Sequence, residues 1–223
     1  MDANESLNIK QGTPEWMAQR LGRVTASRVA DVIAKTKTGY SASRDNYAAQ
    51  LICERLTNLP TESYTNAAMQ WGTETEPKAR QAYESHTFTS VVEVAMIPHP
   101  TIEASGASPD GLVQTEGQIE IKAPNSNTHI DTLLSQTVPS KYITQMQWQM
   151  ACTGRQWCDF VSYDPRAPMG LRLFVKRVDR DNDYILELET EVQKFIRELE
   201  KDCANRIFGT NFQKLRTFSF CHH

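Results

Sequence analysis

Apolar residues recur three and four positions apart along several stretches of the chain, and this spacing places them on one face of a helix. Residues 184–207 show the pattern most clearly, with Ile185, Leu188, Val192 and Phe195 in register. The same spacing predicts helices over residues 13–21, 29–33, 45–57, 129–136 and 141–152. One more helix is expected to begin at Glu74, Glu76 and Pro77, because acids and proline favour a helix start.

Strand-like runs alternate with these helices. Residues 91–97, 157–163 and 171–178 are rich in residues that favour strands, and the apolar residues around Glu120 predict a fourth strand. The order along the chain is helices, strands, helix, strands and helix. This order predicts an α/β fold with a mixed central β-sheet flanked by helices.

Composition and length favour a single soluble domain. The chain has 223 residues, of which 39% are hydrophobic and 23% charged, and no internal repeat divides it. We expect a core over about residues 11–207 and a C-terminal tail at 208–223, for which the pattern gives no element. No apolar run approaches membrane-spanning length, and residues 1–5 lack the features of a signal peptide. Five scattered cysteines indicate reduced thiols in a cytoplasmic protein.

The charge distribution leaves nucleic acid open as a partner. The net charge of −3 argues weakly against it, but residues 9–44 hold seven Lys and Arg against two acids. Such a basic segment could contact DNA, although an ordinary uneven surface would give the same counts.

The candidate chemistry is concentrated in a turn and the strand that follows it. Asp110 lies in a Pro-Asp-Gly turn, and Glu120 and Lys122 lie two residues apart in an apolar strand. Strand side chains alternate between faces, so Glu120 and Lys122 share a face opposite Ile119 and Ile121. Burying this pair is costly unless something binds there. Carboxylates suit Mg²⁺, and a nearby lysine can orient a water or offset phosphate charge. The alternative is a surface strand with a salt bridge.

A second candidate site lies near the start of the chain. Thr25 and Ser27 precede the helix predicted over residues 29–33, and Arg20 is close in sequence. Free backbone N–H groups at a helix start, with hydroxyls and an arginine, would bind a phosphate. Simple capping by Ser or Thr is the commoner use of such residues.

Several separated motifs, taken together, resemble one family. In chain order they are Trp16-x-x-x-Arg20-Leu21-Gly22-x-Val24-Thr25-Ala26-Ser27, Trp71-Gly72-x-x-x-Glu76, Ser108-Pro109-Asp110-Gly111, Glu120-x-Lys122-x-Pro124, Gln145-x-Gln147 and Tyr163-Asp164-Pro165-Arg166. Each motif alone is weak, but the ordered set is specific. It resembles phage lambda exonuclease and its YqaJ-type viral recombinase relatives, within the PD-(D/E)xK nuclease superfamily. The resemblance implies the restriction-endonuclease-like core of that superfamily.

The resemblance also implies roles for individual residues. Asp110, Glu120 and the backbone carbonyl of Ile121 would ligate two Mg²⁺ ions, for which Mn²⁺ can substitute. Glu76 would hold a water of the metal site, and Lys122 with Gln145 would position and activate the attacking water. The 5′-phosphate would be gripped by Arg20, Ser27 and Ser108. More loosely, Met69 falls where the family places a wedge at the terminal base pair, and Lys37 where it places a basic residue near the duplex.

The implied activity is a 5′-to-3′ exonuclease that digests one strand of linear double-stranded DNA and leaves 3′ overhangs for phage-type recombination. The implied assembly is a homotrimeric ring threaded by DNA, with a single-strand annealing protein as a further partner. Three alternatives stay open: another PD-(D/E)xK endonuclease or RecB-like nuclease, a non-catalytic DNA-end-binding protein, and a small-molecule phosphohydrolase. The complete set of acids and lysine argues against the non-catalytic one.

Overall fold

The computed structural model describes residues 9–61 and 67–218 of the chain. Within these residues, five strands form a mixed sheet in the order β10-β9-β8-β7-β4, where β8 and β9 run parallel and the other neighbours antiparallel. The strands are β4 (Val91–Val92), β7 (Gly111–Val113), β8 (Gly117–Lys122), β9 (Trp157–Tyr163) and β10 (Leu173–Asp179). The predicted α/β fold with a mixed sheet and flanking helices is therefore confirmed.

Helices and shorter strands surround this sheet. The helices are α1 (Pro14–Arg20), α2 (Val29–Ile33), α3 (Ala42–Thr57), α4 (Ala67–Thr87), α5 (Ser126–Ser135), α6 (Ser140–Thr153) and α7 (Asn182–Phe218), with 3₁₀ turns η2 (Ala26–Arg28) and η3 (Met169–Leu171). A second sheet joins β1 (Val24–Thr25), β6 (Ser105–Ala107) and β5 (Ile97–Pro98), and a small hairpin pairs β2 (Lys35–Thr36) with β3 (Gly39–Tyr40).

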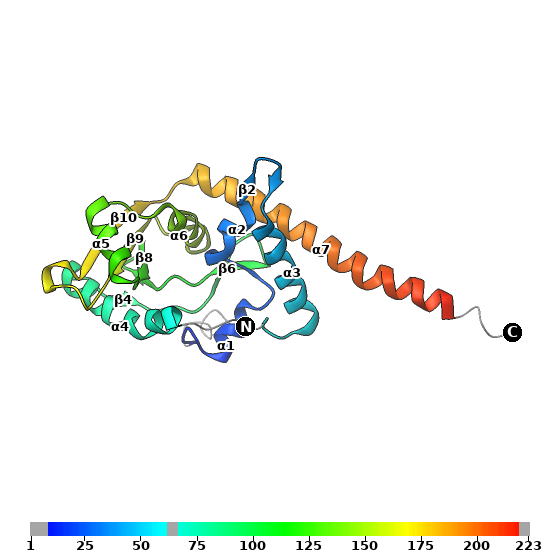
Figure 1. The fold of residues 1–223 in the computed structure, drawn as a ribbon, viewed down its shortest axis with the longest axis horizontal. Coiled ribbons are helices and arrows are strands. Elements are labelled where there is room, and N and C mark those ends of the chain that lie inside the picture. The colour runs from blue at the N-terminus through cyan, green and yellow to red at the C-terminus, as the bar shows by residue number, and fades with distance from the viewer. Residues whose placement is uncertain (1–8, 62–66, 219–223) are drawn as a thin grey trace.

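The two faces of the main sheet are covered by different helices, α4 on one face and α6 on the other (Figure 1). Ile119 and Ile121 of β8 pack in one cluster with Tyr83 of α4. Phe160 of the neighbouring strand β9 packs with Met146 of α6 on the opposite face. Because strand side chains alternate, Glu120 lies on the face that α6 covers.

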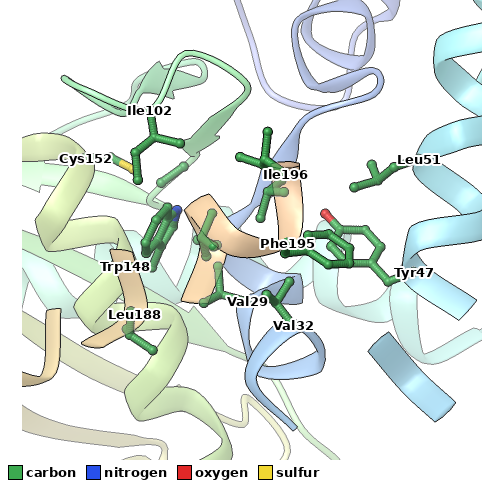
Figure 2. Packing of buried hydrophobic residues seen from close by; sticks show 14 of the residues in the cluster. Val29, Val32, Tyr47, Leu51, Ile102, Trp148, Cys152, Leu188, Phe195 and Ile196 are labelled. Atoms are coloured by element: carbon green, nitrogen blue, oxygen red, sulfur yellow. The ribbon is translucent and has the colours of Figure 1, made fainter. Parts of the chain in front are cut away.

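The largest hydrophobic cluster ties α6 and α7 to the N-terminal helices (Figure 2). Trp148 of α6 and Leu188 of α7 lie at one end of it, and Tyr47 of α3 stacks on Phe195 of α7 at the other, with ring centroids 5.8 Å apart. This cluster fixes the segment from α1 to α2 beside the main sheet. The segment carries Arg20 and Ser27.

Helix α7 extends further than its sequence pattern predicts. The predicted apolar stripe is buried, with Ile185, Leu188, Val192 and Phe195 all at most 3% exposed. The helix continues to Phe218, so residues 208–218 are helical, and its C-terminal part projects away from the other elements (Figure 1). No helix in the described part of the chain is long and apolar enough to cross a membrane.

The strand predicted over residues 91–97 is wrong as a single element. Val91 and Val92 pair with β7 in the main sheet, whereas Ile97 pairs with β6 in the second sheet. Between them Val94, Ala95 and Met96 are all buried, which a half-buried strand with alternating faces cannot achieve. The chain must leave one sheet to reach the other.

The predicted start of α4 is also wrong. The helix already includes Ala67, so Glu76 and Pro77 lie in its interior. A proline there removes a helical hydrogen bond and costs about 3 kcal/mol. Two side-chain contacts support the turns before the proline: the guanidinium of Arg166 lies 4.6 Å from the ring centroid of Trp71, and Gln70 donates to Glu74 one turn later (2.8 Å).

Truncating Phe195 to alanine should lower the free energy of unfolding by about 3–5 kcal/mol, because a fully buried aromatic ring leaves a cavity. Urea unfolding measures the change. Leu186→Ala is the matched control on the same helix, since Leu186 is 63% exposed and should change stability by no more than about 0.5 kcal/mol. Equal losses for the two variants would contradict the placement of α7.

Candidate active site

A cavity of about 510 Å³ opens beside the end of β8. Its walls come from α1, η2, α4, the turn before β7, β8 and α6, which are far apart in the sequence. Ten of the eleven residues singled out from the sequence line it: Arg20, Ser27, Met69, Glu76, Ser108, Asp110, Glu120, Ile121, Lys122 and Gln145. The predicted convergence of these residues is thus observed. Their individual roles stay predictions.

Glu120 is the most enclosed acid of the cavity, with 1% of its surface exposed. Gln145 donates to its Oε1 at 2.7 Å, and Gln149 donates to its Oε2 at 2.6 Å, both from α6. The ammonium of Lys122, two residues on along the same face, contacts Oε1 as an ion pair. Three donors therefore compensate the burial of this carboxylate.

Asp110 lies against β8 from the turn that precedes β7. Its Oδ2 accepts a hydrogen bond from the backbone N–H of Ile121 (2.6 Å), which fixes the side chain beside Glu120. Burial raises the pKa of Asp110 well above its ordinary value, and the negative charges of Glu120 and Glu76 raise it further. Lys122 and the Ile121 N–H oppose this rise without cancelling it.

Glu76 reaches the cavity from the middle of α4. Arg80, one turn later, donates to its Oε1 at 2.7 Å and also pairs with Glu93. Burial raises the pKa of Glu76; Arg80 opposes the rise, while Glu93 and Glu120 add to it. The cavity thus gathers three carboxylates that destabilise one another's charge.

Lys122 supplies the positive charge in this part of the cavity. Burial alone would lower its pKa, but attraction to Glu120 and Asp110 outweighs burial and raises the pKa above the ordinary lysine value. The ammonium also lies 5.0 Å from the ring centroid of Tyr142. In this arrangement Lys122 keeps its proton, so it can donate hydrogen bonds and offset negative charge.

Arg20 and Trp16 of α1, which also line the cavity, converge on Ser108. Arg20 Nη1 and Trp16 Nε1 donate to the Ser108 hydroxyl at 3.3 and 3.0 Å, and the guanidinium lies 4.3 Å from the indole centroid. Burial lowers the pKa of Arg20. Within the described part of the chain, Arg20 forms no ion pair with a carboxylate. The exposed Ser27 lines the same wall.

The predicted helix start at Thr25 and Ser27 needs correction. Residues 26–28 form a single 3₁₀ turn before the five-residue helix α2, and the N–H of Thr25 already donates to the Tyr47 hydroxyl (3.1 Å). A long helix with free N–H groups is therefore not what faces the cavity. Arg20 and the two serine hydroxyls provide its capacity for an anion.

Of the two residues that match the family more loosely, Met69 lines the cavity and Lys37 does not. Met69, at 53% exposure, lines the cavity near the start of α4. Lys37 lies in the turn between β2 and β3, outside the cavity lining, and its side chain is exposed.

The sequence interpretation gave no role to Gln149 or Arg166. The four-residue spacing of Gln145 and Gln149 could have indicated that both face Glu120. Arg166 bonds Asp164 (2.7 Å) and the carbonyl of Pro124 (3.1 Å) while stacking on Trp71. Arg166 therefore joins Trp71 at the start of α4 to Pro124 after β8, so three of the family motifs are adjacent in the structure.

Removing the charge of Asp110 should stabilise the metal-free protein. The folded-state pKa of Asp110 lies above its ordinary value of 3.8, so its ionisation favours the unfolded state as pH rises through the folded pKa. Asp110→Asn should therefore melt at a higher temperature than wild type at pH 8 in EDTA, and this gain should shrink near pH 4. Asp131→Asn, on the exposed side of α5, should show no such trend. A lower melting temperature for Asp110→Asn at pH 8 would refute the argument.

Comparison with known proteins agrees with this geometry. The chain is 54% identical to an alkaline exonuclease (LHK-Exo) from Laribacter hongkongensis, solved alone and in complex with dAMP, with a TM-score of 0.83 over 91% of this chain and 100% of that one. A phage related exonuclease from Haemophilus somnus 129PT, at 16% identity, shares the fold with a TM-score of 0.62 over 87% of this chain and 99% of its own. No curated protein is significantly similar. The YqaJ-like viral recombinase domain matches residues 15–156, and the chain therefore belongs to this family.

Proposed function

We propose that this protein is a magnesium-dependent exonuclease that digests one strand of linear double-stranded DNA from a 5′-phosphorylated end. Family membership and the 54% identity to an alkaline exonuclease support a deoxyribonuclease. The observation that carries the finer proposal is a single cavity lined both by Asp110, Glu120 and Lys122 and by Arg20, which pairs with no carboxylate among the described residues. The first group suits phosphodiester cleavage, and the second suits a terminal phosphate.

The residues of the cavity fit divalent cations. Among the described residues, no group of three or more His, Cys, Asp or Glu side chains could hold a metal ion by itself. Mg²⁺ rarely needs such a cage, because it keeps several waters and binds through one or two carboxylates and the substrate phosphate. Burial is the main cause of the raised pKa of Asp110, and the charges of Glu120 and Glu76 raise it further; a bound cation would offset those charges.

In the proposed site, Asp110, Glu120 and the Ile121 carbonyl would hold two Mg²⁺ ions, for which Mn²⁺ could substitute, and Glu76 would hold a water beside them. When bound, such ions would supply a lowered pKa for the attacking water and charge stabilisation for the leaving oxygen. Lys122 orients that water together with Gln145 and donates to the scissile phosphate. Its raised pKa favours this donor role over that of a base.

Substrate polarity follows from the second group of cavity residues. Arg20, Ser27 and Ser108, which line the cavity, would bind the terminal 5′-phosphate, and Met69, which lines it too, would contact the terminal base pair. After each cleavage the shortened strand again ends in a 5′-phosphate, so digestion proceeds 5′ to 3′ and leaves a 3′ overhang. Such overhangs serve recombination by strand annealing. By the same family resemblance, we propose a homotrimeric ring around the duplex, a single-strand annealing protein as partner, and the cytoplasm as location.

Lys122→Ala should lower the digestion rate of linear duplex about 100-fold or more, because it removes the charged hydrogen-bond donor that orients the water and offsets charge on the phosphate. Duplex binding in EDTA should change little. Lys141→Ala is the matched control, since the Lys141 ammonium lies 4.8 Å from the same Tyr142 ring but outside the cavity. Normal digestion by Lys122→Ala would show that Lys122 has another role.

Wild-type enzyme with Mg²⁺ should digest 5′-phosphorylated linear duplex faster than 5′-hydroxyl duplex, and it should leave covalently closed circles intact. Arg20→Gln should slow digestion of the phosphorylated substrate about 10–100-fold, because a charge-assisted hydrogen bond is worth about 1.5–3 kcal/mol, and should erase most of the preference. Arg23→Gln is the control, because Arg23 bonds the Glu103 carbonyl (2.8 Å) outside this cavity. Cleavage of closed circles would favour an endonuclease instead.

A further inference from the structure

A chain of hydrogen bonds, buried next to Glu120 and partly buried at its far end, runs behind Glu120 to residues outside the cavity lining. Gln149 Nε2 donates to Glu120 Oε2 (2.6 Å), and Gln118 Nε2 donates to Gln149 Oε1 (3.4 Å). The Thr153 hydroxyl donates to Gln118 Oε1 (2.7 Å) and accepts the backbone N–H of Arg155 (3.3 Å). Gln118 and Gln149 are both 0% exposed. We call these contacts the glutamine relay.

The ionised carboxylate end of the relay imposes a direction on it. An ionised carboxylate only accepts hydrogen bonds, so Gln149 must turn its NH₂ toward Glu120 and its oxygen toward Gln118. Gln118 then turns its NH₂ toward the Gln149 oxygen and its own oxygen toward Thr153, so the Thr153 hydroxyl donates to Gln118 while its oxygen accepts the N–H of Arg155. Each amide therefore has one orientation that satisfies its neighbours, and reversing either would leave buried groups unpaired.

The relay reaches Glu120 on the oxygen that the cavity residues leave alone. Gln145 and Lys122, which both line the cavity, contact Oε1, whereas Gln149 contacts Oε2 and does not line the cavity. With Oε2 held by Gln149, the carboxylate is kept in the orientation in which Oε1 faces Gln145 and Lys122. A ligand carboxylate held by an outer partner binds metal more tightly, typically by 10–100-fold.

We propose that Gln149, oriented by Gln118 and Thr153, is a positioning residue that holds Glu120 in the orientation in which it binds divalent cations. This inference rests on the proposed function, because it concerns the same site. Gln149 touches neither DNA nor the reacting groups in this arrangement. Its effect is expected on metal affinity rather than on duplex binding.

The test compares Gln149→Met with Gln147→Met. Both glutamines lie buried on α6 and each makes two hydrogen bonds, but Gln147 bonds the carbonyl of Asp179 (2.8 Å) and the N–H of Asp181 (3.0 Å), away from Glu120. Calorimetric titration with Mn²⁺, without DNA, measures metal affinity. The Mg²⁺ concentration for half-maximal digestion of linear duplex provides a second readout, and melting in EDTA reports stability.

Gln149→Met should weaken Mn²⁺ binding about 10-fold or more and raise the Mg²⁺ requirement in parallel. Gln147→Met should lower the melting temperature at least as much while leaving both metal readouts within about twofold of wild type, since it removes buried hydrogen bonds of another network. Equal metal affinities for the two variants would overturn the inference and assign Gln149 a structural role alone.

Thr153→Val tests the far end of the relay without touching Glu120 or the cavity. Loss of the hydroxyl should weaken Mn²⁺ binding about threefold or more, because it frees Gln118 and then Gln149 to reorient. Wild-type affinity in Thr153→Val would overturn the relay, and this variant decides the question if Gln149→Met does not fold. A wild-type protein that digests no duplex with any divalent cation would instead refute the proposed function.

Discussion

The structure depends on an ionisable carboxylate, that of Glu120, buried at the centre of a β-sheet. A buried carboxylate is costly unless donors surround it, and here Gln145, Gln149 and Lys122 provide them. This requirement determines what can cover that face of β8: a helix that places amides one turn apart opposite the strand. Helix α6 meets it while packing its other residues into the core. The other face of β8 carries apolar residues, and these pack against α4.

The proposed cation site depends on the acids gathered beside Glu120. Burial, together with the charges of Glu120 and Glu76, raises the pKa of Asp110, and Lys122 opposes this rise only in part. Without a cation, such a cluster of acids lowers the free energy of unfolding, and a bound cation would raise it again. The cost is accommodated because the large cluster around Trp148 and the stripe of α7 stabilise the fold elsewhere (Figure 2).

Features set by local periodicity could be predicted from the sequence. The two-residue period of a strand placed Glu120 and Lys122 together, and the apolar spacing of residues 184–207 identified the buried face of α7. Features set by distant contacts could not. The split of residues 91–97 depends on which sheets β6 and β7 belong to, and the early start of α4 depends on Arg166 stacking on Trp71. The spacing shows that Gln149 lies on the same helix face as Gln145. It does not show that this face packs against the strand that carries Glu120.

The central claim is that Asp110 and Glu120 together hold a divalent cation in the cavity that also contains Lys122. Anomalous scattering from a crystal soaked in Mn²⁺ tests this most directly. The account predicts a peak at about 2.0–2.3 Å from carboxylate oxygens of both residues, a distance typical of small hard cations. A peak elsewhere, or none at saturating Mn²⁺ with Lys122 still paired to Glu120, would contradict it.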